Sequence, residues 1–266
     1  MASRGVFSFG THLWDPSHRF ETSWLLPPCI LFACRALIVL PLHIHNPLLH
    51  HRLHVRNPPP LGGCETVRRS FSYFTVLTYW GLGFYFLVSS VHTLSYSLRG
   101  RPLLDTFPRP LQALHSLFYT TAVTLPFLVT IVYWGLLYAT ALHALNSAFA
   151  LFEVLLARTE PPPWLHLLWL VALLLGYLAV AYVTVATQGW YTYRFLDHDA
   201  VGGRAYVAAY VFGIAAGVVV VFLVVSRVIR LRRWLTEVKM GMDGMFARQP
   251  ARSHVEMNTI GSKVTH

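Results

Sequence analysis

A run of 48 residues, Gln112 to Thr159, contains one acidic side chain, Glu153, and one basic side chain, Arg158. An α-helix rises about 1.5 Å per residue, so this run can form about 70 Å of helix. That length is enough for two crossings of a bilayer whose hydrocarbon core is about 30 Å thick. The run predicts a polytopic membrane protein, whose function is best sought in its intramembrane polar residues.

The composition of the whole chain agrees with a membrane protein. Hydrophobic residues make up 55% of the 266 residues and charged residues 12%, against about 25% charged residues in a typical soluble domain. A net charge of +10 would suit nucleic acid if the basic residues formed a stripe among exposed aromatic residues. They lie instead in loops and near the C-terminus, so we expect no nucleic-acid partner.

Six apolar segments predict an all-α fold, a polytopic bundle of six transmembrane spans. The segments run from Ser23 to Leu42, Ser72 to Leu94, Ala113 to Leu137, Thr140 to Leu156, Trp164 to Thr187 and Tyr206 to Ile229. Residues 1–22 are expected to form an N-terminal cytoplasmic segment and residues 23–230 the transmembrane domain. Residues 231–266 are expected to form a basic, largely disordered tail.

The distribution of Lys and Arg predicts the orientation. With both termini on one side of the membrane, fourteen of these residues fall on that side and six on the opposite side. Because cytoplasmic loops carry an excess of Lys and Arg, both termini are expected in the cytoplasm. The basic segment from Arg227 to Arg233 is expected to bind anionic lipid head groups, at about 1 kcal/mol per basic residue. Endoplasmic reticulum and plasma membrane both fit, because no retention or lipidation signal is evident.

Thr75 and His143 are the candidate catalytic residues. In the predicted topology the second and fourth spans begin at the non-cytoplasmic side, and each residue lies about one helical turn below that surface. A threonine hydroxyl is a weak nucleophile until a base removes its proton, and imidazole is suited to that near neutral pH. The spacing by itself is weak evidence for a catalytic pair. A threonine hydroxyl in a membrane helix commonly bonds a preceding carbonyl and then has only a structural role.

The segment 140–156 carries a polar face. Its members recur at three- and four-residue steps, and they are His143, Asn146, Ser147, Ala150 and Glu153. We expect this face to point into the bundle, where its groups either bond neighbouring helices or serve a function. An unpaired carboxylate there costs at least about 2.5 kcal/mol, so Glu153 needs a partner, for which Arg35 is a candidate.

The segment from His43 to His54 is rich in histidine. Membrane desaturases and hydroxylases bind two irons with histidines from several separate boxes, whereas one cluster is present here. We interpret it as a solvated loop, with a structural metal site as the alternative, and expect no metal and no cofactor. Gly213 and Gly217 form a small-xxx-small motif, which is a helix-packing device.

Several motifs occur in order between residues 70 and 234. They are Tyr73-Phe-Thr75-Val-Leu, Leu117-Phe-Tyr-Thr-Thr121 before Pro126, His143-Ala-Leu-Asn146 with Glu153 ten residues after the histidine, and Gly189-Trp-Tyr-Thr-Tyr193. This order resembles the androgen-induced and androgen-dependent tissue-factor-pathway-inhibitor-regulating membrane proteins and their fungal and plant relatives. The chain resembles a fungal-like member of that family.

The resemblance implies a six-span threonine hydrolase that acts on fatty acid esters of hydroxy fatty acids or similar lipid esters. The nucleophilic threonine and the catalytic histidine of the family match Thr75 and His143. Asn146 and Glu153 are candidate supporting residues, Asn146 as a donor to the oxyanion one turn below His143. The implied partners are a lipid ester substrate and membrane lipids.

Two features depart from the family pattern. Its members usually carry a polar loop between the third and fourth spans, whereas here Tyr138 to Leu142 must serve as both turn and helix end. A tight hairpin and a missing stretch of sequence are both compatible with this. The histidine-rich segment is the second departure. The alternative functions are a non-enzymatic membrane scaffold or regulator and, less favoured because no internal repeat is evident, a transporter.

Overall fold

A computed structural model of the protein describes residues 14–40, 69–136, 142–244 and 246. Within these residues every regular element is a helix, and one isolated bridge joins Ser23 to Ala157. The N-terminal helix spans Pro28–Leu40. The longer elements that follow are α3 (Phe74–Arg99), α4 (Arg109–Leu136), α5 (Leu142–Leu156), α6 (Leu165–Gln188) and α8 (Arg204–Arg233). The short elements are η1 (Leu103–Thr106), η2 (Arg194–Leu196), α7 (His198–Val201) and the π-helical η3 (Trp234–Lys239).

Four of the described helices, α3, α4, α6 and α8, are long and apolar enough to cross a membrane. The other two predicted spans correspond to shorter apolar helices, Pro28–Leu40 and Leu145–Leu156. The predicted all-α class is confirmed for the described residues, and the helices are those of an integral membrane protein.

The outer faces of α6 and α8 are apolar and open. Leu168 is 67% exposed, Val183 59% and Phe212 75%. Water would penalise this surface by roughly 25 cal/mol per Å², whereas lipid tails would not. Buried polar residues such as Thr93, Asn146 and Glu153 lie inside. This inverted pattern is what a helix bundle surrounded by hydrocarbon requires.

The helix ends follow from local chemistry. Gly100 and Gly189 end α3 and α6 in the left-handed conformation, both with φ of 73°, which other residues adopt at a cost. The first predicted segment began at Ser23, but its helix begins at Pro28. Proline suits the first turn of a helix because it lacks an N–H donor. The residues before it cap α5 instead: the Ser23 hydroxyl donates to the Leu156 carbonyl at 2.6 Å.

Helices α4 and α5 pack side by side along much of their length. Near the end of α4, the hydroxyls of Thr130 and Ser147 lie 2.8 Å apart. In the N-terminal half of α4, the hydroxyls of Tyr119 and Thr159 lie 2.5 Å apart. The two helices are therefore antiparallel and adjacent. The turn itself, within residues 137–141, lies outside the described residues.

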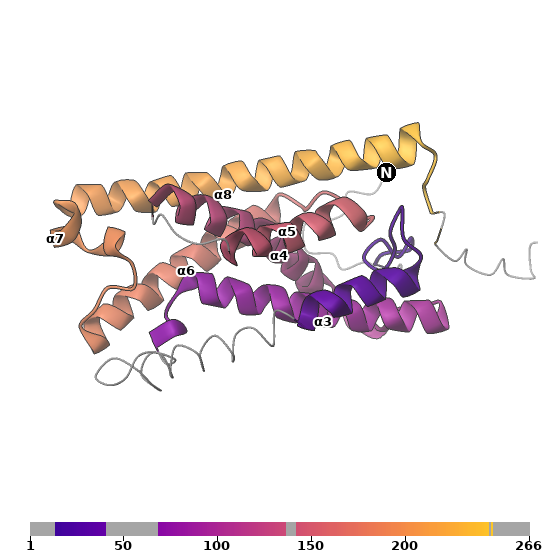
Figure 1. Cartoon of the computed structure of the whole chain (residues 1–266), viewed down its shortest axis with the longest axis horizontal. Coiled ribbons are helices and arrows are strands. Elements are labelled where there is room, and N and C mark those ends of the chain that lie inside the picture. Colours follow the sequence, from indigo (N-terminus) through magenta and orange to yellow (C-terminus); the bar gives the residue numbers. More distant parts are fainter. Residues whose placement is uncertain (1–13, 41–68, 137–141, 245, 247–266) are drawn as a thin grey trace, which may run out of the picture.

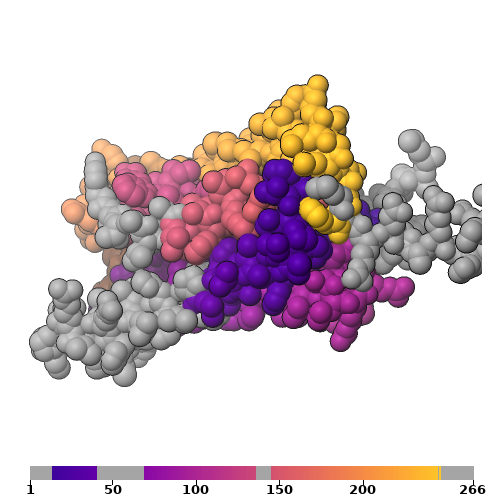
Figure 2. Space-filling view, turned by 45° about the vertical axis from the view of Figure 1, so that its right-hand side comes forward, coloured from indigo at the N-terminus to yellow at the C-terminus, as the bar shows by residue number. Residues whose placement is uncertain are grey.

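The bundle has two ends with different contents (Figure 1). The Thr75 end contains residues 72–78 and the connection 189–204 between α6 and α8. The two segments meet where the Thr75 N–H donates to the Tyr193 hydroxyl at 3.4 Å. The Arg19 end contains residues 14–24, 156–163 and 230–243. Figure 2 shows the N-terminal segment, in indigo, lying against α5 and the yellow end of α8.

Helices α3 and α5 run in the same direction. Near the C-terminal end of α3, the Tyr96 ring lies 5.0 Å from the ring of His18. At the C-terminal end of α5, the Leu156 carbonyl accepts a hydrogen bond from Ser23. Because His18 and Ser23 belong to the same short N-terminal segment, both helices end at the Arg19 end and begin toward the Thr75 end.

Helix α8 crosses the boundary that we predicted between residues 230 and 231. It continues to Arg233 and then as η3 to Lys239. Arg232 is 5% exposed and donates to the carbonyls of Val154, Ala157 and Thr159, which closes the C-terminal end of α5. The small-xxx-small motif packs at Gly217, where an added Cβ would lie 3.2 Å from Leu128, while Gly213 has open space.

Candidate functional site

Thr75 is the second residue of α3 and lines an apolar cavity of about 110 Å³. Aliphatic and aromatic side chains of α4, α6 and α8 form most of the wall. The cavity also contacts the hydroxyl-bearing residues Thr75, Tyr133, Tyr177 and Tyr193. A mostly apolar space with a few converging hydroxyl groups is typical of a site that binds a lipid chain close to a polar group.

The Thr75 backbone is held by a tyrosine from a distant part of the chain. Its N–H donates to the Tyr193 hydroxyl at 3.4 Å. Thr75 N–H is one of the donors at the start of α3 that have no partner within the helix, and Tyr73 provides no side-chain cap. Burial raises the pKa of Tyr193 above its usual range, so this hydroxyl keeps its proton near neutral pH.

A second apolar space, a groove of about 600 Å³, lies beside the cavity between α3, α4 and α6. Phe74 and Tyr177 line both spaces, and their ring centroids are 4.9 Å apart. Gly81 and Gly176 lie along the groove, and a Cβ added at either position would meet nothing within 4 Å. Thr75 therefore lies close to two apolar compartments divided by two aromatic rings.

His143 is the second residue of α5, and its side chain lies outside the described residues. The level of its backbone follows from helix contacts. The Tyr85 hydroxyl of α3 donates to Glu153 of α5 at 2.7 Å, and the neighbouring Phe86 ring lies 6.4 Å from the rings of Phe149 and Phe152. Tyr85 and Glu153 therefore lie within about one helical turn of the same level. Thr75 and His143 each precede them by ten residues. Since α3 and α5 run in the same direction, ten-residue steps of about 15 Å bring both backbones to about the same level.

The polar face of α5 points into the bundle, as predicted, for its described members. Ala150 is fully buried, and Asn146 is 5% exposed. Ser147 is half-buried, and its hydroxyl donates to the Pro126 carbonyl at 3.1 Å. The side-chain oxygen of Asn146 has no hydrogen-bond partner within the described part of the protein. An orphan buried acceptor is unusual and marks a place where a ligand or water can bond.

Glu153 has the partner that its burial requires. Arg35 donates to both of its carboxylate oxygens, with the Nε bond at 3.2 Å, and Tyr85 donates to Oε1. Arg35 also donates to the Thr93 hydroxyl and to the Phe20 carbonyl. The candidate pair of Arg35 and Glu153 is therefore present, and it joins the N-terminal helix, α3 and α5.

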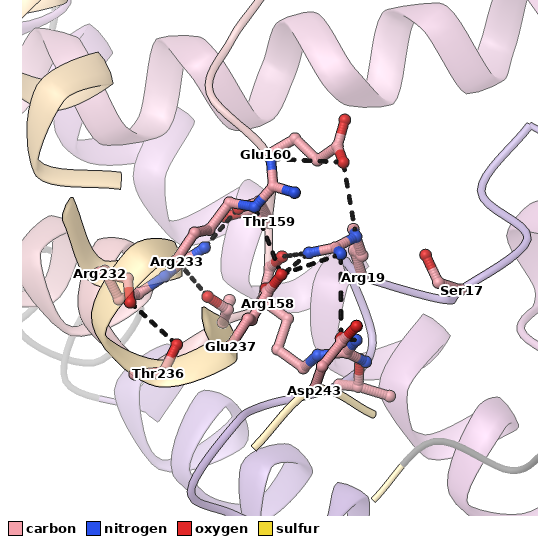
Figure 3. A network of polar contacts seen from close by, with 12 residues as sticks. Ser17, Arg19, Arg158, Thr159, Glu160, Arg232, Arg233, Thr236, Glu237 and Asp243 are labelled. Carbon is pink, nitrogen blue, oxygen red and sulfur yellow. Dashed lines mark hydrogen bonds and ion pairs between the residues drawn. The ribbon is translucent and has the colours of Figure 1, made fainter. Parts of the chain in front are cut away.

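A second polar network at the Arg19 end was not predicted from the sequence (Figure 3). Arg19 donates to both carboxylate oxygens of Glu237, at 2.7 and 3.1 Å, and to the Arg158 carbonyl at 3.0 Å. Glu160 and Asp243 add ion pairs with Arg19 at 3.5 and 3.9 Å. Sequence reasoning missed this network because its members are far apart in the chain: Arg19 and Glu237, for example, are separated by 218 residues.

Candidate metal ligands are few in the part of the chain that the structure describes. Asp197, His198 and Asp199 are the one group there whose ligand atoms lie close together. Asp197 caps α7 by accepting from the N–H groups of Asp199 and Ala200, which accounts for its position. The histidine-rich segment from His43 to His54 lies outside the described residues.

Comparison of the chain with family models, with curated proteins and with solved structures finds no match. The resemblance to the androgen-induced family therefore stays a prediction from the sequence. The fold and the site define a class all the same: a helical membrane protein with apolar cavities beside a threonine hydroxyl.

Proposed function

We propose that the protein is an intramembrane hydrolase of lipid esters, with Thr75 as the nucleophile and His143 as the general base. The observation that carries the proposal is the register of α3 and α5. Tyr85 bonds Glu153, and Thr75 and His143 each lie ten residues before these two on parallel helices. This register supports similar levels for the backbones of Thr75 and His143. A nucleophile and its base must meet in this way.

The proposed reaction has two stages. The Thr75 hydroxyl attacks the ester carbonyl carbon while His143 takes its proton, and the carbonyl oxygen becomes an oxyanion. Collapse of this intermediate breaks the bond to the alcohol, which leaves with the proton from His143. Water, activated by the same imidazole, then releases the fatty acid from Thr75. Asn146 and Glu153 are kept as supporting residues, Glu153 by holding α5 against α3 and the N-terminal helix through Tyr85 and Arg35.

The two apolar spaces beside Thr75 support an ester with two hydrocarbon chains as the substrate. In an ester of a hydroxy fatty acid, one chain lies on the acyl side of the ester bond and the other on the alcohol side. The cavity and the groove meet at Phe74 and Tyr177, next to Thr75. Each space would take one chain.

The transporter alternative receives less support from the contacts of Glu153. A carboxylate that carries an ion or a proton must be able to release Arg35, and both carboxylate oxygens are bonded to that guanidinium. The scaffold alternative is supported by the exposed basic residues Arg227 and Arg230 at the end of α8. We propose that these bind anionic lipid head groups at the cytoplasmic face.

The proposed membrane arrangement has six spans with both termini in the cytoplasm, in the endoplasmic reticulum or the plasma membrane. It adds the helices Pro28–Leu40 and Leu145–Leu156 to the four long helices. The Thr75 end then faces away from the cytoplasm, and the basic Arg19 end faces it, as the excess of Lys and Arg favours.

The test is hydrolysis of a lipid ester by membranes containing wild-type protein, Thr75→Ala or His143→Ala. We expect the rate of hydrolysis to fall at least about a thousand-fold in both variants. The nucleophile and its general base act together, so losing either one disables the pair. Labelling by a fluorophosphonate probe should disappear with Thr75→Ala. Thr187→Ala is the matched control, since Thr187 is an exposed residue near the end of α6 whose hydroxyl bonds the Val183 carbonyl at 2.7 Å. Full activity in Thr75→Ala would overturn the proposal.

A further inference from the structure

Tyr193 places a hydroxyl group beside the proposed nucleophile. Its oxygen accepts from the Thr75 N–H at 3.4 Å, and its hydroxyl also interacts with the side chains of Thr75 and Tyr177. Tyr193 comes from the connection before η2, 118 residues further along the chain than Thr75. The contact therefore depends on the tertiary fold and is not a local turn.

Three ring contacts fix the orientation of the Tyr193 ring. The Phe195 ring stacks on it, with centroids 5.1 Å apart and planes 9° apart. The Tyr73 and Tyr177 rings meet its edges at 5.7 and 6.4 Å. Because neighbouring rings restrict rotation, the hydroxyl is held in place before any ligand arrives. Such preorganisation is what makes a hydrogen-bond donor effective in a transition state.

We propose that the Tyr193 hydroxyl donates a hydrogen bond to the oxyanion that forms when Thr75 attacks the ester carbonyl. This role rests on the proposed hydrolase function. The new bond joins the Thr75 oxygen to the carbonyl carbon, and the π electrons of the carbonyl move to its oxygen. His143 holds the proton taken from Thr75. Tyr193 keeps its own proton and donates only a hydrogen bond, which strengthens as negative charge develops.

Tyr193 suits this role better than Asn146, the donor considered from the sequence. Asn146 lies one turn further along α5 from His143, about 4.5 Å deeper than the proposed level of reaction. Tyr193 already touches Thr75, and burial raises the pKa of its hydroxyl, so the donor stays protonated at neutral pH.

Tyr193→Phe tests the proposal, because it removes the hydroxyl and keeps the ring. We expect kcat for ester hydrolysis to fall by about 100- to 1000-fold with little change in KM, as for other lost oxyanion donors. The rate of hydrolysis should fall by the same factor for a p-nitrophenyl ester and for an alkyl ester, because the oxyanion forms with either leaving group. Tyr191→Phe is the matched control from the same connection. Its side chain packs in the apolar cluster beside Tyr193, and we expect it to keep the wild-type rate.

The outcomes separate the two proposals. A Tyr193→Phe rate within about two-fold of wild type, with Thr75→Ala inactive, would overturn the role of Tyr193 and leave the hydrolase standing. A loss confined to the alkyl ester would also overturn it, since that pattern belongs to a proton donor for the leaving alcohol. Full activity in Thr75→Ala would overturn both.

A fluorinated tyrosine at position 193 keeps the shape of the site if Tyr193→Phe disturbs folding. Fluorination makes the phenol more acidic, and an ionised phenolate cannot donate a hydrogen bond. We expect the alkaline limb of the pH–rate profile to move to lower pH with the fluorinated residue. A role limited to capping α3 would leave that limb unchanged, and such a result would overturn the proposal.

Discussion

At the Arg19 end, the helix termini are closed by side chains from distant parts of the sequence. Arg232 donates to three carbonyls at the end of α5, and the Ser23 hydroxyl donates to a fourth. At the Thr75 end, α3 begins without a side-chain cap, and its first turns line a cavity and a groove. Orphan carbonyls in an apolar medium are expensive, so the first arrangement favours stability.

The difference suggests that one end of the bundle contributes mainly to stability and the other to ligand binding. We expect stability to come from bonds at the Arg19 end, such as those of Arg19 and Arg232, and from the buried pair of Arg35 and Glu153. The Thr75 end leaves space and a weakly bonded backbone N–H. Sites that bind ligands keep such local imperfections, because a fully packed and bonded end could not accept a substrate.

Arg35→Met should have the largest effect on stability. It leaves Glu153 buried without its cation, at a cost of about 3–5 kcal/mol. The measurement is thermal unfolding in detergent, followed by helix content. The double variant Arg35→Met with Glu153→Leu should recover most of the loss, because a matched apolar pair replaces the ion pair. Thr75→Ala should change stability by about 1 kcal/mol or less. Equal losses of stability in Arg35→Met and Thr75→Ala would contradict the proposed difference between the stabilising groups and the Thr75 end.

Glu21 should make stability depend on pH. The pKa of its carboxyl is raised from 4.5 to about 8, mainly by burial and also by the nearby carboxyl group of Asp15, while Arg35 acts in the opposite direction. Between these two values the folded protein holds a proton that the unfolded chain has lost, so stability falls as pH rises. The slope reaches about 1.4 kcal/mol per pH unit in that window.

Glu21→Gln should flatten this slope, because its amide does not titrate. Unfolding of both proteins between about pH 5 and pH 8.5 measures the difference. Asp15 and Asp105 also have pKa values raised by burial, so part of the slope remains in the variant. Parallel slopes for Glu21→Gln and wild type would show that Glu21 does not titrate in this window.

The sequence predicted the helices well and their junctions less well. Hydropathy located all five of the helices α3, α4, α5, α6 and α8, because lipid exposure demands long apolar runs. It ended the second segment at Leu94, whereas α3 continues to Arg99, because Gly100 sets that end. The pair of Arg35 and Glu153 could be anticipated, since a buried carboxylate needs a cation.

Other parts of the site could not be predicted from sequence patterns. The bond between Arg19 and Glu237 and the contact of Tyr193 with Thr75 join residues 218 and 118 positions apart. Periodicity is a local signal, and it does not specify which distant residues meet. The motif Gly189 to Tyr193 was noted for its residues, but only the fold gives Tyr193 a position beside Thr75.

Gly176→Leu should affect the choice of substrate at the Thr75 end. A Cβ at Gly176 meets nothing within 4 Å, so the leucine side chain would extend into the groove without disturbing α6. If the groove takes the second chain, hydrolysis of a two-chain ester should fall by about ten-fold relative to a short p-nitrophenyl ester. Gly213→Leu is the control, since Gly213 also has open space and lies outside both apolar spaces. Equal loss for both esters would place the second chain elsewhere.

Arg233→Ala should have the smallest effect, although Arg233 belongs to the network at the Arg19 end. Its side chain is 32% exposed, and its ion pairs with Glu160 and Glu237 are both 3.5 Å long. Exposed pairs of this kind contribute about 0.5 kcal/mol and weaken with salt. Arg19→Ala should cost more, about 1.5–3 kcal/mol, because Arg19 is 12% exposed and bonds both oxygens of Glu237.

Thermal unfolding at low and high salt distinguishes the contributions of Arg233 and Arg19 to stability. Salt should reduce the small effect of Arg233→Ala and leave most of the effect of Arg19→Ala. Water and ions reach the exposed ion pairs of Arg233 but not the buried bonds between Arg19 and Glu237. If the two variants lost equal stability, the total charge of the network, and not its individual bonds, would determine its contribution to stability. Burial of individual bonds would then not account for the stability that we expect at the Arg19 end.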